Sequence, residues 1–327
     1  MTIKFCKDVD EILGDKEYRY FGNGYKNVHY DILNLSLEPE KITAFTTIHY
    51  PLAWSKKDTP KELVPHLSTI DAAYIGLQLS EVFLITLLDL KNILRNQMFI
   101  KTLHLKAKNG VLEDLSKVSC EISYSVVTGE PYDKHQFSGQ IGNIAFYSEI
   151  ELPPCPVRPL VKKCYEEVDE ILGDSQDRYF GRLYEHTKHY IKNIETDCDK
   201  FTSQADIHVE NQVFNIDKHY GIDTFHLSNF QPSVIDCIVA IAQLSQVLIY
   251  EMDDLDRKNS QTLWMRNVKI DRKRVTESEY HPSSIQVEKS KMIKMRQEKW
   301  RMVDLEGKFF NYQFRYSLAH ILPKEVN

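Results

Sequence analysis

The fold is decided by the stretch Ser68-Thr-Ile-Asp-Ala-Ala-Tyr-Ile-Gly-Leu-Gln-Leu-Ser-Glu-Val-Phe-Leu-Ile-Thr-Leu-Leu88. Apolar residues recur in it at helical intervals, at Ile75, Leu79, Val82 and Leu87. Ser68, with Asp71 three residues later, has the pattern of a capping box, which starts a helix. The sequence therefore predicts a long apolar helix from Ser68 to about Leu94.

Outward from this helix, the chain repeats itself. Val9-Asp-Glu-Ile-Leu-Gly-Asp15 recurs letter for letter as Val168-Asp-Glu-Ile-Leu-Gly-Asp174, and Arg19-Tyr-Phe-Gly22 recurs as Arg178-Tyr-Phe-Gly181. Weaker matches follow in the same order: Tyr25 with Tyr184, His29-Tyr30 with His189-Tyr190 after a one-residue slip, Ser68-Thr-Ile-Asp71 with Ser233-Val-Ile-Asp236, and Gln78 with Gln243. This shared order predicts a tandem duplication of one domain.

A proline-rich stretch separates the two copies. Leu152-Pro-Pro-Cys-Pro-Val-Arg-Pro159 cannot lie inside a helix or a central strand, because proline lacks the amide hydrogen and fixes its φ angle. We expect residues 1–152 to form the first domain, residues 153–159 the linker and residues 160–327 the second domain.

Strand-like runs surround the predicted helix in both copies. The first copy has one such run before the helix and three after it: Thr43–Tyr50, Met98–Leu105, Val118–Val127 and Ile141–Leu152. The second copy has a helix from Ser233 to about Met252, then Thr262–Ile270, Ser284–Met295 and Lys308–Ile321. One long helix among strands predicts an α+β fold, in which each half is a curved antiparallel sheet around a central helix. Two such halves suggest a double hot dog.

Composition excludes several classes of protein. With 327 residues, 42% of them hydrophobic, and a net charge of −6, the chain is neither disordered nor suited to nucleic acid as its main partner. The longest uncharged apolar run, Val82 to Leu88, is far shorter than the roughly 20 residues of a membrane span, and no signal peptide is visible. Six cysteines without a C-x-x-C pair indicate reduced thiols and a cytoplasmic protein.

The common sequence signatures of nucleotide, zinc and serine-hydrolase sites are absent: G-x-x-x-x-G-K-[ST], G-x-G-x-x-G, G-x-S-x-G and H-E-x-x-H. We therefore expect no cofactor and no metal. Chemistry, if present, must come from ordinary acidic and basic side chains.

The candidate catalytic residues gather at the helix starts. His66 precedes the first helix, Asp71 lies in its first turn, and Gln78 follows two turns later on the same face. The second copy has Asp236 and Gln243, but Gln231 where the first has its histidine. An imidazole and a carboxylate at one cavity can divide the acid and base roles at neutral pH. We expect His66 to abstract a proton, and Asp71 or Asp236 to orient it or to protonate the leaving group.

Structural interpretations compete with these roles. Both aspartates fit helix caps, and both glutamines fit hydrogen bonds that fix packing. Arg19 and its counterpart fit a turn in which the guanidinium bonds carbonyl oxygens or an acid, with binding of an anionic group as the alternative. Trp54 lies in a loop that the second copy lacks, and such loops can cover a pocket. These alternatives remain open from the sequence.

A basic stretch in the second copy has two interpretations, at Lys289, Lys291, Lys294, Arg296, Lys299 and Arg301. It fits a solvated strand face, which is the commoner case, or a docking surface for an acidic partner such as an acyl carrier protein. The duplicated chain is compatible with a monomer, since it already supplies a pair of domains, or with a homodimer.

The motifs V-D-E-I-L-G-D and R-Y-F-G-N-G-Y, Tyr50-Pro-Leu-Ala-Trp-Ser-Lys56 and P-H-L-S-T-I-D-A resemble the avirulence protein D (AvrD) family of bacteria. The resemblance implies synthesis of small acylated signal molecules, the syringolides, from a β-ketoacyl thioester and a sugar-like polyol. It implies no particular catalytic residues.

A more distant likeness concerns Gln231-Pro-Ser-Val-Ile-Asp-Cys237. It is similar to the helix entry of double hot-dog dehydratases of polyketide synthases. There a His-Pro leads, five residues on, to an Asp that acts as the general acid and is followed by a Gln. His66 also precedes Asp71 by five. This chain departs from that pattern because its Gln follows the Asp at seven positions rather than four, and because it lacks a His-x-x-x-Gly-x-x-x-x-Pro motif.

These observations predict an enzyme that condenses a β-ketoacyl thioester with a polyol. The acyl tail is expected in an apolar tunnel between the two helices, with Gln78, Gln243, Trp54 and Arg19 binding substrate. The alternatives are an acyl-binding protein without chemistry and a 3-hydroxyacyl-thioester dehydratase.

Overall fold

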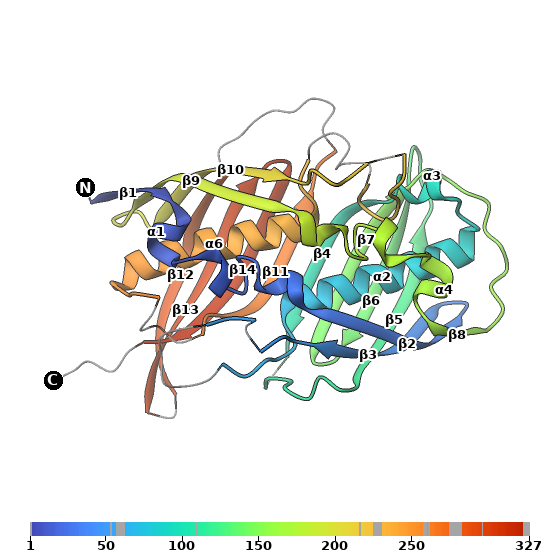
Figure 1. The fold of residues 1–327 in the computed structure, drawn as a ribbon, viewed down its shortest axis with the longest axis horizontal. Coiled ribbons are helices and arrows are strands. Elements are labelled where there is room, and N and C mark those ends of the chain that lie inside the picture. Colours follow the sequence, from blue (N-terminus) through green and yellow to red (C-terminus); the bar gives the residue numbers. More distant parts are fainter. Residues whose placement is uncertain are drawn as a thin grey trace.

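The computed structural model describes residues 2–52, 54–56, 63–108, 110–215, 217–224, 231–257, 260, 262–274, 283–295 and 297–322. Within these residues, 14 strands form one antiparallel sheet in the order β1-β9-β10-β12-β13-β14-β11-β4-β7-β6-β5-β3-β2-β8 (Figure 1). The two sequence halves meet where β4 pairs with β11, with Leu105 opposite Val268.

Each half of the sequence supplies seven of these 14 strands. The first half supplies β1 (Ile3–Asp8), β2 (His29–Glu38), β3 (Lys41–His49), β4 (Phe99–Ala107), β5 (Val118–Val127), β6 (Asp133–Ile141) and β7 (Ile144–Leu152). The second half supplies β8 (Lys163–Glu167), β9 (Lys188–Asp197), β10 (Thr202–Glu210), β11 (Trp264–Arg272), β12 (Ser283–Met295), β13 (Glu298–Phe309) and β14 (Tyr312–Ile321).

Each half gives its first strand to the other half. β1 pairs with β9, and β8 pairs with β2, so the two ends of the sheet are each completed by the other sequence repeat (Figure 1). The short helices that follow these strands, α1 (Val9–Leu13) and α4 (Asp169–Leu172), pack on the long helix of the other half. The two repeats are therefore linked by more than residues 153–159.

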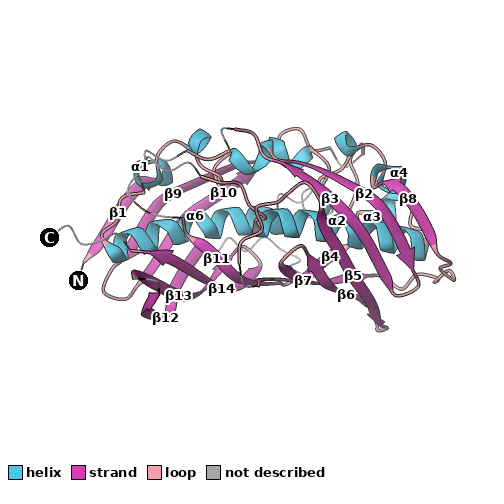
Figure 2. Cartoon of the chain, turned by 90° about the horizontal axis from the view of Figure 1, so that it is seen from below, coloured by secondary structure: helices cyan, strands magenta, loops and turns pink. Residues whose placement is uncertain are grey.

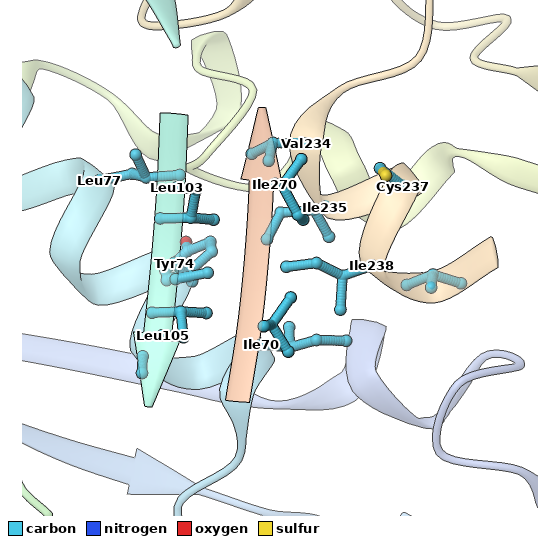
Figure 3. Packing of buried hydrophobic residues seen from close by; sticks show 14 of the residues in the cluster. Ile70, Tyr74, Leu77, Leu103, Leu105, Val234, Ile235, Cys237, Ile238 and Ile270 are labelled. Carbon is cyan, nitrogen blue, oxygen red and sulfur yellow. The ribbon is translucent and has the colours of Figure 1, made fainter. Parts of the chain in front are cut away.

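Two long helices lie in one line, with strands on both sides of them (Figure 2). They are α2 (Thr69–Leu88) and α6 (Val234–Asp253). Their first turns meet at the centre, where Ile70 and Tyr74 lie near Val234, Ile235 and Ile238, together with Leu105 of β4 and Ile270 of β11 (Figure 3). All of these side chains are buried, so the helix starts are part of one continuous core.

A glycine sets how closely α2 approaches the sheet. A Cβ atom at Gly76 would lie 2.3 Å from the ring of Phe146 on β7. Glycine in a helix interior costs about 1 kcal/mol relative to alanine. Here that cost is offset by close contact between helix and strand.

The α+β class predicted from the sequence is confirmed. Helix α2 ends earlier than expected, because Asp89 adopts a left-handed conformation with φ 50° and a short separate helix, α3 (Asn92–Arg95), follows it. The predicted run Ile141–Leu152 corresponds to β7 and the last residue of β6, and the rest of β6 was not predicted as a strand.

Both long helices have the length and apolar composition of a membrane span. The short uncharged apolar runs of the sequence had predicted that no segment would reach that length. In each of them 89% of the apolar window is buried inside the structure. Burial of that kind is typical of the core helix of a globular fold, and the apolar face of each helix is covered by the sheet.

Candidate functional site

The repeated Arg-Tyr-Phe-Gly segments connect the two halves at the helix starts. Arg19 donates from Nη1 to Oε1 of Gln243 at 2.9 Å, and Arg178 makes the same bond to Gln78 at 2.9 Å. The second guanidinium nitrogen of each arginine pairs with an acid of its own segment, Asp10 or Asp169. Both arginines are buried, so each crosses from its own repeat to the helix of the other.

The tyrosine that follows each arginine turns back to the helix of its own repeat. The hydroxyl of Tyr20 lies 2.7 Å from Ser68 Oγ, and that of Tyr179 lies 2.8 Å from Ser233 Oγ. Both serines cap their helix, and both capping boxes are complete. The capping interpretation of the two aspartates is therefore correct, and each carboxylate makes further contacts.

Asp71 lies among three tyrosines. Tyr50 donates to Oδ2 at 2.6 Å, Tyr30 donates to Oδ1 at 2.8 Å, and Tyr20 donates to Oδ1 at 3.3 Å. Burial raises the pKa of Asp71, although the hydrogen bonds from Tyr50 and Ser68 oppose this. Burial and the charge of Asp71 also raise the pKa of Tyr50 well above its usual value, which keeps this hydroxyl protonated.

Asp236 has a histidine where Asp71 has a tyrosine. Nε2 of His189 lies 2.8 Å from Oδ1 of Asp236, and Tyr179 donates to Oδ2 at 3.0 Å. Burial opposes the charged form of Asp236, but the hydrogen bonds and charge contributed by His189, together with those from Ser233, outweigh it and lower the pKa. The pKa values of the two matching carboxylates are thus shifted in opposite directions.

The structure corrects one detail of the sequence repeat. His29-Tyr30 was matched to His189-Tyr190 with a one-residue slip, but Tyr30 and His189 make the equivalent contacts to Asp71 and Asp236. The two copies therefore align here without a one-residue shift, and Tyr30 of the first copy corresponds to His189 of the second.

A cavity of about 130 Å³ adjoins the start of α2, and we call it the His66 cavity. Its lining includes Tyr20, Tyr50, Trp54, His66 and Ser68 from the first half and Arg257, Trp264, Met265 and Arg266 from the second. The half-buried ring of His66 lies 4.8 Å from that of Trp264 and 6.3 Å from that of Trp54, measured between centroids. His66 is therefore at a cavity bordered by both halves.

The structure does not bring the predicted catalytic side chains into direct contact. Within the described residues, the His66 ring lies within hydrogen-bond distance of the carbonyl oxygen of Val64, 3.2 Å from Nδ1. The carboxylate oxygens of Asp71 accept hydrogen bonds from tyrosines and from the Ser68 amide. Asp236 contacts His189 instead of His66. Tyr50 stands between the two groups, since its hydroxyl bonds Asp71 and lies 3.3 Å from the carbonyl oxygen of His66.

The acyl tunnel expected between the helices is filled by side chains. Ile70, Tyr74, Val234, Ile235 and Ile238 occupy that space (Figure 3). Of the predicted substrate-binding residues, Trp54 and Arg19 line the His66 cavity. Gln78 and Gln243 bind the crossing arginines. A role of these four residues in binding substrate stays a prediction.

A second cavity, of about 630 Å³, lies on the other side of Arg19, and we call it the Lys26 cavity. Its lining includes Arg19, Lys26, His189 and Gln243. Sequence reasoning missed Lys26 and His189 as functional candidates. The sequence signal that could have identified them is a difference between the repeats. Glu185 stands where the first repeat has Lys26, and Tyr30 stands where the second repeat has His189.

Other predicted features have simple outcomes. No group of three or more metal-binding side chains occurs among the residues that the structure describes. Of the basic stretch, Lys289, Lys291 and Lys294 lie on exposed parts of β12, Arg301 pairs with Asp253, and Arg296 falls outside the described residues. An acyl carrier protein as partner stays a prediction.

Three of the solved structures that resemble this chain in shape come from mycobacteria. The tesB protein of Mycobacterium avium subspecies paratuberculosis has a TM-score of 0.40 at 7% identity, covering 88% of this chain and 95% of its own. Acyl-CoA thioesterase II TesB2 of Mycobacterium marinum has a TM-score of 0.36 at 8% identity, covering 90% and 97%. The dehydratase domain of PpsC from Mycobacterium tuberculosis, solved with C12:1-CoA, has a TM-score of 0.34 at 8% identity, covering 89% and 98%.

At these scores the similar structures carry no argument about chemistry. A comparison with curated protein sequences found no match. The family comparison is decisive, because the model described as Pseudomonas avirulence D protein (AvrD) matches residues 4–323. The chain therefore belongs to the AvrD family.

Proposed function

We propose that this protein is an enzyme that binds a β-ketoacyl thioester in the His66 cavity and joins the acyl group to a small polyol. The observation that carries the proposal is the position of His66, which lies between two tryptophans in a cavity bordered by both halves. Family membership supports it, since the resemblance to AvrD proteins implies syringolide-like products.

The dimensions and lining of the His66 cavity suit the reacting end of the substrate. An apolar cavity of roughly 150 Å³ accepts a benzene-sized group, so about 130 Å³ holds a ketoacyl head rather than a whole acyl chain. Trp54 and Trp264 supply apolar walls. Arg257 and Arg266 suit the phosphate groups that coenzyme A and the carrier-protein arm both contain.

The proposed reaction is an acyl transfer. His66 accepts the proton of a polyol hydroxyl, whose oxygen attacks the thioester carbonyl carbon. The new C–O bond forms as the C–S bond breaks, and the departing thiolate takes the proton from His66.

Asp71 enters this proposal as a positioning residue. It holds Tyr50, which faces the same cavity as His66, and does not itself touch the reacting atoms. Asp236 has the corresponding position behind His189. Gln78 and Gln243 act by holding the two crossing arginines, one of which, Arg19, lines the His66 cavity.

We also propose that the architecture is a double hot dog produced by duplication of one domain, divided at residues 153–159. The repeated motifs, the two long capped helices and the near-equal hydrogen bonds of Arg19 and Arg178 support this origin. Location in the cytoplasm, and existence as a monomer or homodimer, belong to the same proposal.

The experiment measures release of free thiol from a β-ketoacyl thioester, with and without a small polyol. Polyol-dependent thiol release together with an acylated polyol in the mass spectrum is the expected result. Thiol release that ignores the polyol would instead indicate a thioesterase. Conversion of a 3-hydroxyacyl thioester to an enoyl thioester would indicate a dehydratase.

One observation favours a second candidate, an acyl-binding protein without chemistry. Both cap aspartates have full sets of hydrogen bonds within the protein, so neither needs a substrate to satisfy it. Saturable binding of the thioester with no thiol release in the same assay would support this candidate and contradict the enzyme.

A further inference from the structure

Two substitutions break the internal symmetry, and both fall at the Lys26 cavity. Tyr25 and Tyr184 occupy matching turns, Gly24–Asn27 and Leu183–His186, so Lys26 of the first repeat corresponds to Glu185 of the second. His189 of the second repeat corresponds to Tyr30 of the first. The divergent lysine and histidine come from different repeats and line one cavity.

Lys26 holds a positive charge that no carboxylate neutralises by direct contact within the described residues. Its Nζ donates to Asn23 Oδ1 at 2.8 Å and to the carbonyl oxygen of Thr187, both of which are neutral acceptors. An ammonium group has three donors, and the third is left for an occupant of the cavity. A half-buried cation with neutral partners is a favourable position for an anion.

The acids that line the Lys26 cavity are already bonded. Asp10 pairs with Arg19, and Glu185 accepts from Arg182 at 3.1 Å. Glu17 accepts from Asn23 at 2.5 Å, and Asp8 caps α1 by accepting from the amide of Asp10 at 3.0 Å. These contacts reduce the repulsion that an incoming anion would meet.

His189 adds a ring nitrogen that is open to a ligand, and Arg19 adds an unused donor. Nε2 of His189 is engaged with Asp236, while the described residues include no hydrogen-bond partner for Nδ1. Nδ1 can therefore bond a ligand hydroxyl, as an acceptor in the neutral imidazole or as a donor in the imidazolium. Nε of Arg19 is buried and has no partner in the described structure, although Nε of the equivalent Arg178 donates to Gly173 O at 3.1 Å.

We propose that the Lys26 cavity is a binding site for a small hydroxylated anion of the sugar-phosphate kind. Lys26 binds the anionic group, and Nδ1 of His189, whose ring is held by Asp236, forms a hydrogen bond with a hydroxyl. A volume of about 630 Å³ lies within the roughly 300–1,000 Å³ of small-molecule sites. The proposal does not depend on acyl transfer in the His66 cavity.

The test is titration calorimetry of the full-length protein with glycerol 3-phosphate as the probe and no thioester present. Three variants are compared: Lys26→Gln, His189→Tyr and, as a charge-matched control, Lys162→Gln on the exposed surface. His189→Tyr installs the residue that the first repeat already uses against its aspartate, so folding is expected to survive. Urea unfolding of each variant checks that expectation.

The parent and the Lys162→Gln variant should bind the probe alike. Lys26→Gln should weaken binding by about tenfold or more, as loss of a charge-assisted hydrogen bond does. His189→Tyr should weaken it by a smaller factor, and inorganic phosphate should bind the parent less tightly than glycerol 3-phosphate. The proposal fails if the parent shows no saturable binding up to about 10 mM probe, or if Lys26→Gln binds as the parent does.

Discussion

Arg19 and Gln243 are 224 residues apart in the chain, yet Nη1 of the arginine lies 2.9 Å from Oε1 of the glutamine in the buried centre of the molecule. The same bond recurs between Arg178 and Gln78. Each repeat thus places its arginine on the helix of the other and its neighbouring tyrosine on its own helix. This crossing arrangement holds the two helix starts, and hence both cavities, in a fixed relation.

Replacing Arg178 by alanine should destabilise the protein strongly. The change removes three hydrogen bonds and leaves buried Gln78 and the carbonyl of Gly173 without their donor. Breaking a buried charged network typically costs about 3–5 kcal/mol in the free energy of unfolding. Urea denaturation measures this, with Arg182→Ala, at a half-exposed pair, expected to cost less than about 1 kcal/mol. Equal costs for both variants would contradict the role of the crossing arginine.

His66→Ala should lower the rate of acyl transfer by about 10²- to 10⁴-fold, the usual contribution of a general base. The fold should be retained, because the ring is half-buried and bonds a backbone carbonyl of its own loop. His49→Ala is the matched control, since His49 is exposed and pairs with Asp31 on the sheet. Thiol release under saturating substrate measures the effect, and a rate unchanged by His66→Ala would remove this residue from the mechanism.

Asp71 and Asp236 should influence stability with opposite dependence on pH. The pKa of Asp71 is raised in the folded state, so the folded protein binds more protons and loses stability as pH rises from 3.8 through the raised value. The pKa of Asp236 is lowered, so its stabilisation is present above 3.8 and is lost as pH falls through the lowered value.

The asparagine variants test this difference. Relative to the parent, Asp71→Asn should appear more stable at about pH 8 than at about pH 4. Asp236→Asn should appear less stable, relative to the parent, at about pH 6 than at about pH 2.5. Urea unfolding at these pH values gives both comparisons. The same trend in both variants would show that the two centres do not differ as described.

Lys26 should react with amine reagents at unusually low pH. Burial lowers its pKa to about 8, although the negative charge of Asp236 counteracts this, so the reactive neutral amine becomes abundant near that pH. Lys162 is the control, because its hydrogen bond to Glu38 raises the pKa from 10.5. Cyanate labelling followed by mass spectrometry should show a midpoint near pH 8 at Lys26. A midpoint at Lys26 as high as that of Lys162 would contradict it.

Separating the halves should prevent folding of either one. Residues 1–152 contain β1, which pairs with β9, and residues 160–327 contain β8, which pairs with β2. Each fragment alone therefore has a displaced first strand and an exposed central edge at β4 or β11. Circular dichroism and gel filtration should show a folded complex only after mixing, and cooperative unfolding of one isolated fragment would contradict the exchange.

Much of the local structure was predictable from the sequence. The helix of residues 69–88, its capping box and the corresponding helix of the second repeat follow from the spacing of apolar residues and from Ser68 and Asp71, because these signals act over one or two turns. The family resemblance was also carried by short motifs. The prediction of an acyl tunnel between the two helices was wrong, because helical periodicity cannot reveal which side chains of two helices meet.

Only the tertiary structure decided which residues face one another across the repeats. Arg19 and Gln243, Lys26 and His189, and β1 and β9 are distant in the chain, and such pairings depend on how the whole sheet closes. The sequence by itself determined the α+β class and two apolar helices, each of which starts at a capping box. The packing of the two sequence halves determined where their polar residues meet, since buried hydrogen bonds require partners that no local pattern specifies.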